Sequence, residues 1–181
     1  METTGATPTF CRCRTLILGC GNDLFGDDGF GREVARRLSA SGVPDAVCVV
    51  DAGTSVRHVL FDVVLSETRP EEVIVVDAVD VGREPGSVFE IDVAEIPFVK
   101  LDDFSMHQIP TSNLLRELES AAGVRVTCLV CQVESVPGEV RPGLSAAVER
   151  AVDEAVRVLG RRFGEIAPAD RGKEQANHVR G

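Results

Sequence analysis

Short apolar runs alternate along the chain with longer stretches in which apolar residues recur every three or four positions. The short runs predict buried strands, and the longer stretches predict helices with one apolar face. The clearest helical stripe lies in residues 56–64, where the apolar positions follow the i, i+3, i+4, i+7, i+8 pattern. The predicted strands are residues 15–18, 46–50, 73–76, 87–92 and 124–130, and the predicted helices are about residues 30–42, 56–69, 112–122 and 144–159.

Two of the predicted strands differ in their environment. Residues 73–76 are all β-branched and apolar, which is typical of a central parallel strand that is buried on both faces. Residues 87–92 alternate between polar and apolar, which predicts a half-exposed strand, antiparallel and at or near an edge. Because strands alternate with helices, we expect a three-layer α/β/α sandwich with a twisted, mostly parallel five-stranded sheet and one antiparallel strand.

One domain accounts for most of the chain. The length of 181 residues, with 44% hydrophobic residues, suits a single core, which we place at residues 14–160. Residues 1–13 are expected to be a flexible N-terminus, and residues 161–181 a disordered tail, because the tail lacks apolar periodicity.

Charge and composition exclude several classes of function. The net charge of −10, with eight Phe and no Trp or Tyr, argues against a nucleic-acid partner, which needs clustered basic and stacking groups. No apolar run approaches ~18 residues, so no membrane span is expected. The first ten residues lack the basic and apolar regions of a signal peptide, which predicts a cytoplasmic protein whose six cysteines are reduced thiols.

Polar residues follow the predicted strands at one edge of the sheet, where open α/β sheets bind their ligands. Gly21 and Asn22 follow the first strand, Asp51 and Thr54 follow the second, and Asp77 ends the third. A carboxylate at the end of a buried strand is partly desolvated and needs a partner. We therefore expect the functional site at this edge.

An imidazole and a second carboxylate extend this set. His107 lies in a loop just before a predicted helix, whereas His58 and His178 lie on a helix shoulder and in the tail. Asp28, in the acidic loop after the first strand, either belongs to the site or only favours the N-terminus of the next helix. Together with Asp77, these groups would suit a borderline divalent metal such as zinc or nickel. The cysteines at 128 and 131 lie three apart in a strand, so they face opposite sides and do not bind a metal jointly.

A dinucleotide site is a weaker alternative. Gly19 and Gly21 follow a strand, but Leu24 stands where the third glycine of the fingerprint belongs. Asp51 lies too far along the chain for the ribose-binding acid, and the acidic loop repels phosphates.

The order of several motifs resembles that of the NiFe-hydrogenase maturation endopeptidases. The opening motif LILGCGNDLFGDDGFG, residues 16–31, follows the family pattern of an apolar strand, G-x-G-N and a short loop ending in D-[DE]-x-x-G. The resemblance continues through DAGT at 51–54, IVVDAVD at 74–80, PG at 85–86 and SMHQ at 105–108, and it covers about residues 14–160.

This resemblance implies a peptidase that removes a C-terminal extension from the nickel-loaded large-subunit precursor of a NiFe hydrogenase. It implies that Asp28, Asp77 and His107 contact the metal and act in catalysis, with Asp51, Thr54, Gly21 and Asn22 supporting the cleft. The nickel is expected to be held by the precursor, with no permanent cofactor. H-E-x-x-H and G-x-S-x-G motifs are absent from the sequence. A non-cleaving nickel-checkpoint chaperone of the same fold is the alternative, and the choice of hydrogenase, formate-linked, F420-reducing or other, stays open.

Overall fold

The computed structural model describes residues 8–93 and 111–164. Its five strands form one sheet in the order β2-β1-β3-β5-β4. β1, β2, β3 and β5 run parallel, and β4 pairs with β5 in the antiparallel direction at one edge, so both the mostly parallel sheet and its antiparallel strand are confirmed. The strands are β1 (Thr15–Cys20), β2 (Val47–Gly53), β3 (Glu72–Val79), β4 (Val88–Ile91) and β5 (Arg125–Gln132).

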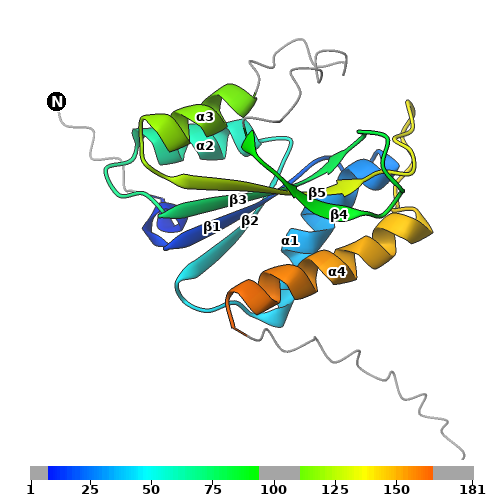
Figure 1. Cartoon of the computed structure of the whole chain (residues 1–181), viewed down its shortest axis with the longest axis horizontal. Coiled ribbons are helices and arrows are strands. Elements are labelled where there is room, and N and C mark those ends of the chain that lie inside the picture. The colour runs from blue at the N-terminus through cyan, green and yellow to red at the C-terminus, as the bar shows by residue number, and fades with distance from the viewer. Residues whose placement is uncertain (1–7, 94–110, 165–181) are drawn as a thin grey trace, which may run out of the picture.

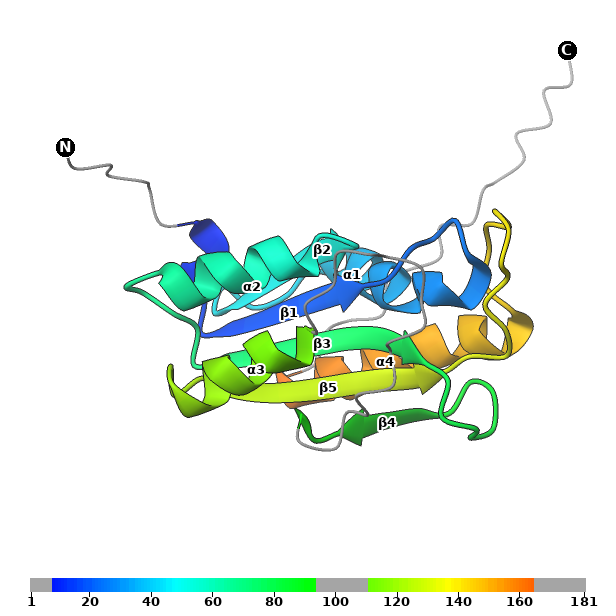
Figure 2. The same cartoon turned by 90° about the horizontal axis from the view of Figure 1, so that it is seen from above.

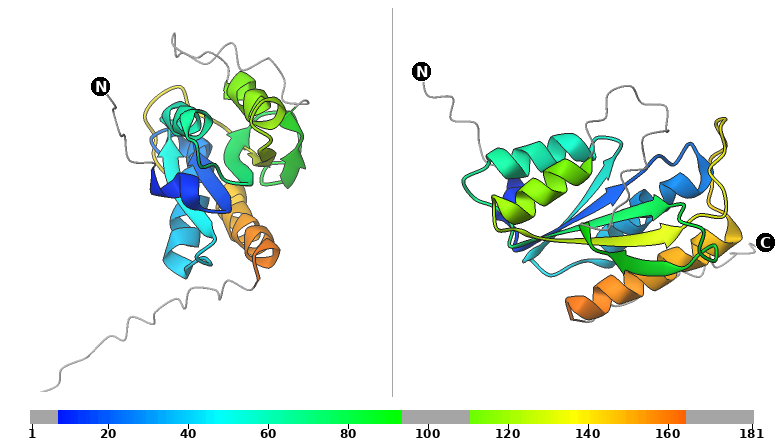
Figure 3. Two further views of the ribbon diagram at one scale, coloured as in Figure 1. Left: turned by 90° about the vertical axis from the view of Figure 1, so that its left-hand side faces the viewer. Right: turned by 45° about the horizontal axis from the view of Figure 1, so that its top comes forward.

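Helices cover both faces of this sheet, which confirms the three-layer sandwich. α2 and α3 lie on one side, and α1 and α4 lie on the other (Figures 1 and 3). Each side has its own hydrophobic cluster, with the sheet between them. None of the described helices is both long enough and apolar enough to cross a membrane. The helices are α1 (Phe30–Ser41), α2 (Val56–Leu65), α3 (Thr111–Ser120) and α4 (Ala146–Arg162), with two 3-10 turns, η1 (Thr9–Arg12) and η2 (Gly26–Gly29).

The centre of the sheet is the most apolar part of the molecule. All six residues of β1 are buried, as are the first five of β3, which is the central strand that its β-branched run predicts. On β5, Cys128 belongs to the cluster under α2 and α3, whereas Cys131 belongs to the cluster under α1 and α4. The prediction that these two cysteines face opposite sides is confirmed.

Small residues let the start of α1 lie almost on the sheet. A Cβ atom at Gly31 would come within 2.1 Å of the Val76 carbonyl oxygen, and one at Gly19 within 2.3 Å of the Gly31 carbonyl oxygen. Any side chain at either position would push the helix away from β1 and β3. This close approach brings the loop before α1 next to the end of β3.

The structure corrects two expectations near the N-terminus. Residues 9–12 form η1 with Cys11 fully buried, so ordered structure begins before residue 14. Cys13 and Cys48 form a disulfide, with 5.8 Å between their Cα atoms, so the expectation of six reduced cysteines is wrong for this pair. The pairing arises because the segment before β1 runs beside β2, a contact that spacing along the chain does not reveal. At the other end, α4 continues past residue 160 to Arg162.

Candidate active site

The carboxyl ends of the parallel strands and the loops that follow them gather on one side of the molecule (Figure 2). We call this side the carboxyl edge of the sheet, and the side where the strands begin the amino edge. Asp28 lies on η2, Asp51 near the end of β2, and Asp77 near the end of β3. η2 packs against β3, so Asp28 and Asp77 lie on neighbouring elements of this edge. The structure thus brings these two predicted carboxylates to the same part of the molecule.

Gly21 and Asn22 hold Asp28 in place. Gly21 adopts a φ of +105°, and a Cβ atom there would lie 1.8 Å from the Asp28 carbonyl oxygen, so only glycine fits. The next amide N–H, that of Asn22, donates to Asp28 Oδ2 at 2.7 Å and to its carbonyl oxygen at 3.2 Å. The two residues therefore fix the direction of the Asp28 side chain, which is a supporting role.

Asp77 is half-buried on the side of the sheet that α2 and α3 cover. Its Oδ1 accepts the N–H of Ala78 at 2.9 Å, which fixes the carboxylate against its own strand. Burial raises the pKa of the neighbouring Cys128 thiol to about 12, and the negative charge of Asp77 adds to that rise. Cys128 is therefore a neutral thiol near pH 7 and is not poised to act as a nucleophile or metal ligand.

Asp51 is bound by an arginine that the sequence analysis did not single out. Arg32, in the first turn of α1, donates from Nε and Nη2 to the two Asp51 carboxylate oxygens at 2.9 and 3.0 Å. Its Nη1 donates to Asp23 at 2.6 Å, and the bond to Asp51 raises the pKa of the guanidinium. Asp51 thus carries an ion pair at the rim of the site, and Thr54 lies exposed in the turn between β2 and α2. The sequence feature that could have identified Arg32 is its place as an isolated basic residue four positions after Asp28.

Two buried polar side chains at this edge were also missed. Asp27 accepts three backbone N–H groups from the loop between β5 and α4. Gln132, at the end of β5, bonds with its amide oxygen to the N–H groups of Val81 and Arg83. A polar residue ending an apolar strand was the signal that identified Asp77, and it would also have identified Gln132.

His107 lies outside the described residues, so its place in the site stays a prediction. Within 8–93 and 111–164, no three His, Cys, Asp or Glu side chains are grouped so that they could hold a metal ion.

The loop after β1 is not arranged to receive a phosphate. A phosphate-binding loop directs backbone N–H groups at its ligand. Here the N–H groups along the loop already donate within the protein, most of them to backbone oxygens. The residues whose N–H groups are used in this way are Gly21, Asn22, Leu24, Phe25, Gly26 and Asp28. The geometry therefore argues against the dinucleotide alternative.

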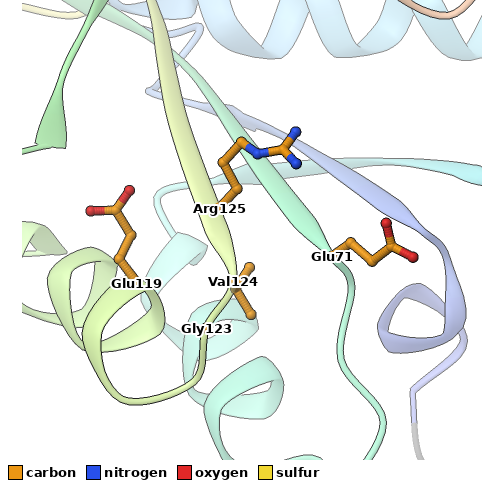
Figure 4. A pocket seen from close by; sticks show the side chains of 5 residues that line it. All are labelled: Glu71, Glu119, Gly123, Val124 and Arg125. Carbon is orange, nitrogen blue, oxygen red and sulfur yellow. The ribbon is translucent and has the colours of Figure 1, made fainter.

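A hollow of the described surface lies at the opposite edge of the sheet. It has a volume of about 470 Å³ and is lined by Glu71, Glu119, Gly123, Val124 and Arg125 (Figure 4). Two of its charged residues are paired with neighbours outside the lining, since Glu71 binds Arg14 at 2.9 Å and Arg125 lies 3.4 Å from Glu72. Glu119 lies near the end of α3 and the other lining residues precede or begin β3 and β5, whereas Asp28 and Asp77 lie at the other end of the strands, so the hollow is not part of the candidate site.

Several known proteins resemble this chain in sequence and in fold. A family model described as hydrogenase maturation protease matches residues 32–161. The chain is 42% identical over 152 residues to a Methanocaldococcus jannaschii protein named for that family, covering 83% of this chain and 95% of the relative. It is 36% identical over 149 residues to the delta subunit of coenzyme F420 hydrogenase from Methanothermobacter thermautotrophicus, covering 80% and 90% of the two chains. The solved Escherichia coli hydrogenase maturating endopeptidase HybD matches with a TM-score of 0.62 and 26% identity, over 83% of this chain and 94% of its own. This chain belongs to the hydrogenase maturation proteases, which are endopeptidases.

Proposed function

We propose that this protease removes a C-terminal extension from the nickel-loaded large-subunit precursor of a NiFe hydrogenase. The observation that supports this most is the pair of carboxylates at the carboxyl edge of the sheet. Asp28 and Asp77 come from neighbouring elements, and a backbone N–H orients one oxygen of each side chain. Preoriented carboxylate oxygens are suitable partners for a divalent metal that a substrate presents.

In this proposal the nickel is part of the substrate. Asp28 and Asp77, with His107, contact the nickel that the precursor carries and so bring the scissile peptide bond to the edge of the sheet. Polarisation of the carbonyl by the metal, or activation of water by a carboxylate, then lowers the barrier. Water adds to the carbonyl carbon, the C–N bond breaks, and the departing amine takes up a proton. Recognition and cleavage are thereby coupled, because an unloaded precursor lacks the ion that positions the bond.

The remaining polar groups support the two carboxylates. Gly21 and Asn22 hold Asp28 through the contacts described above, and the Arg32–Asp51 pair forms the neighbouring rim. A bidentate guanidinium–carboxylate pair has a fixed geometry, so it gives the rim a defined shape. We assign Asp51 a supporting role for this reason, since Arg32 engages both of its carboxylate oxygens.

Substitution of the metal-contacting residues tests the assignment. We expect Asp77→Ala and His107→Ala to abolish removal of the extension, measured as the mass of the precursor after incubation, with a circular dichroism spectrum close to that of the unmodified protein. Asp28→Glu is expected to retain more activity than Asp28→Ala, because the carboxylate is kept. Full activity in any of the three alanine variants would remove that residue from the site.

A further inference from the structure

The loop between β5 and α4, residues 133–145, lies directly against the loop that carries Asp28 (Figure 2). The Gly26 N–H donates to the Arg141 carbonyl oxygen at 2.9 Å, and the Arg141 N–H donates to the Leu24 carbonyl oxygen at 2.8 Å. Phe25 and Arg141 are paired as an isolated parallel bridge. The two loops therefore form one continuous surface that begins two residues from Asp28.

Asp27 fixes this surface from beneath. Its side chain is 1% exposed, and its Oδ2 accepts the N–H groups of Glu134 and Ser135 at 2.9 and 3.2 Å. Its Oδ1 accepts the N–H of Ser145 at 2.6 Å, and the Ser145 hydroxyl in turn caps α4 by accepting the Val148 N–H. One buried carboxylate thus holds both ends of the loop through charge-assisted hydrogen bonds. A loop held in this way presents its outer side chains in a fixed arrangement.

Those outer side chains include aliphatic groups that serve no core. Leu24 is 46% exposed, Val136 48% and Val140 64%. They are three of the seven large hydrophobic side chains that are exposed among the described residues. Single exposed apolar residues are ordinary, but a group on two hydrogen-bonded loops beside a functional site is typical of an interaction surface.

We propose that this docking surface, formed by Leu24, Val136 and Val140, receives aliphatic side chains of the precursor polypeptide that the protease cleaves. The inference rests on the proposed function. The docking surface begins two residues from Asp28 and is hydrogen-bonded to the loop of residues 24–26, so a polypeptide whose scissile bond lies at Asp28 can extend over it. Two hollows of the described structure lie at the other edge of the sheet, away from this surface. Burial of these side chains by the precursor supplies binding energy next to the reacting bond.

An acidic substitution of the docking surface tests this proposal against a matched control. The double variant Val136→Asp, Val140→Asp replaces apolar side chains at exposed positions, where substitutions change the stability of the fold little. Leu65→Asp makes the same kind of change at a residue that is 79% exposed, at the C-terminal end of α2. A serine pair, Val136→Ser with Val140→Ser, separates the loss of apolar area from the added charge.

The assay uses a nickel-loaded large-subunit precursor, with kcat and KM from its mass change and Kd measured in the Asp77→Ala background. We expect KM and Kd to rise about tenfold in the aspartate pair and less in the serine pair, with kcat within about twofold and with Leu65→Asp unchanged. An unchanged KM and Kd in the aspartate pair would overturn the proposal, as would an equal rise for Leu65→Asp.

Two further outcomes separate this proposal from the proposed function. Binding that depends on Val136 and Val140, without any cleavage by the unmodified protein, would support the docking surface and contradict the proposed cleavage. A dimer that the aspartate pair dissociates, with cleavage and KM unchanged, would assign the surface to a second copy of this chain and overturn its assignment to the precursor.

Discussion

Asp27 and Asp28 are neighbours in the sequence but face different parts of the molecule. Asp27 is buried on the side of α1 and α4, where it binds the backbone of the β5–α4 loop. Asp28 turns toward Asn22 at the edge of the sheet. The first therefore shapes the wall beside the candidate site, and the second is a candidate for the chemistry.

Asp27→Asn tests the role of the buried carboxylate. An amide side chain has one accepting oxygen, so its NH2 group would face at least one of the three N–H donors. We expect the free energy of unfolding to fall by about 2–3 kcal/mol, measured by urea denaturation. We also expect KM for the precursor to rise, because the docking surface loses its support.

The exposed Asp45→Asn is the control for this substitution, with an expected change in the free energy of unfolding within about 0.5 kcal/mol. An unchanged stability and KM in Asp27→Asn would show that the loop holds its position without the charge.

The residues of the site differ in how far the sequence predicts them. Asp77 is found because a carboxylate ends a buried strand, a pattern that is local to its own segment. Arg32 binds Asp51 from another element, and Asp27 binds a loop more than a hundred residues away. Such contacts depend on how elements pack, and nothing in the local pattern distinguishes Asp27 from Asp28.

At the scale of elements, α1 and α4 are joined by one arginine. Arg37 on α1 bonds to Glu33 on its own helix at 2.7 Å, and to Glu149 and Asp153 on α4, the latter at 2.7 Å. Arg36, one position earlier, pairs only within α1 in the described contacts and is more exposed. Arg37 therefore links the two helices that cover one face of the sheet.

Arg37→Ala is expected to lower the free energy of unfolding by about 1–2 kcal/mol at neutral pH, and Arg36→Ala by no more than about 0.5 kcal/mol. Hydrogen bonding to Arg36 and Arg37 lowers the pKa of Glu33 below its ordinary value of 4.5. A carboxyl group with a lowered pKa in the folded state stabilises fully above 4.5, and that stabilisation is lost as the pH falls through the lower folded value. The difference in the free energy of unfolding between the unmodified protein and Arg37→Ala should therefore become smaller as the pH falls. Equal effects of the two alanine variants in urea titrations would contradict the link between α1 and α4.

The order and type of the elements could be predicted, whereas their ends could not. Apolar periodicity predicts each helix and strand because each is buried on a defined face. β2 continues to Gly53, beyond the predicted end at residue 50, because Gly53 pairs with Cys20 after a shift in register. Asp51 therefore lies within the strand, although aspartate is disfavoured there. The C-terminal end of β2 is set by its pairing with β1, so the residues of β2 alone do not predict where the strand ends.

At the scale of the whole molecule, the two edges of the sheet differ in role. The amino edge carries paired Arg and Glu side chains that join β3, β5 and the end of α4, as in the bond between Arg162 and Glu72 at 2.6 Å. The carboxyl edge carries Asp77 near the end of β3, Asp28 on η2, and the docking surface on a loop that the buried Asp27 holds in place. An acidic protein with a net charge of −10 is also suited to a partner that presents a bound cation.

The most direct test of the central claim is the mass of a NiFe-hydrogenase large-subunit precursor after incubation with this protein, with and without nickel in the precursor. The account predicts loss of a C-terminal peptide from the nickel-loaded precursor and an unchanged mass for the nickel-free one. Equal cleavage of both, or no cleavage of the loaded precursor, would contradict it.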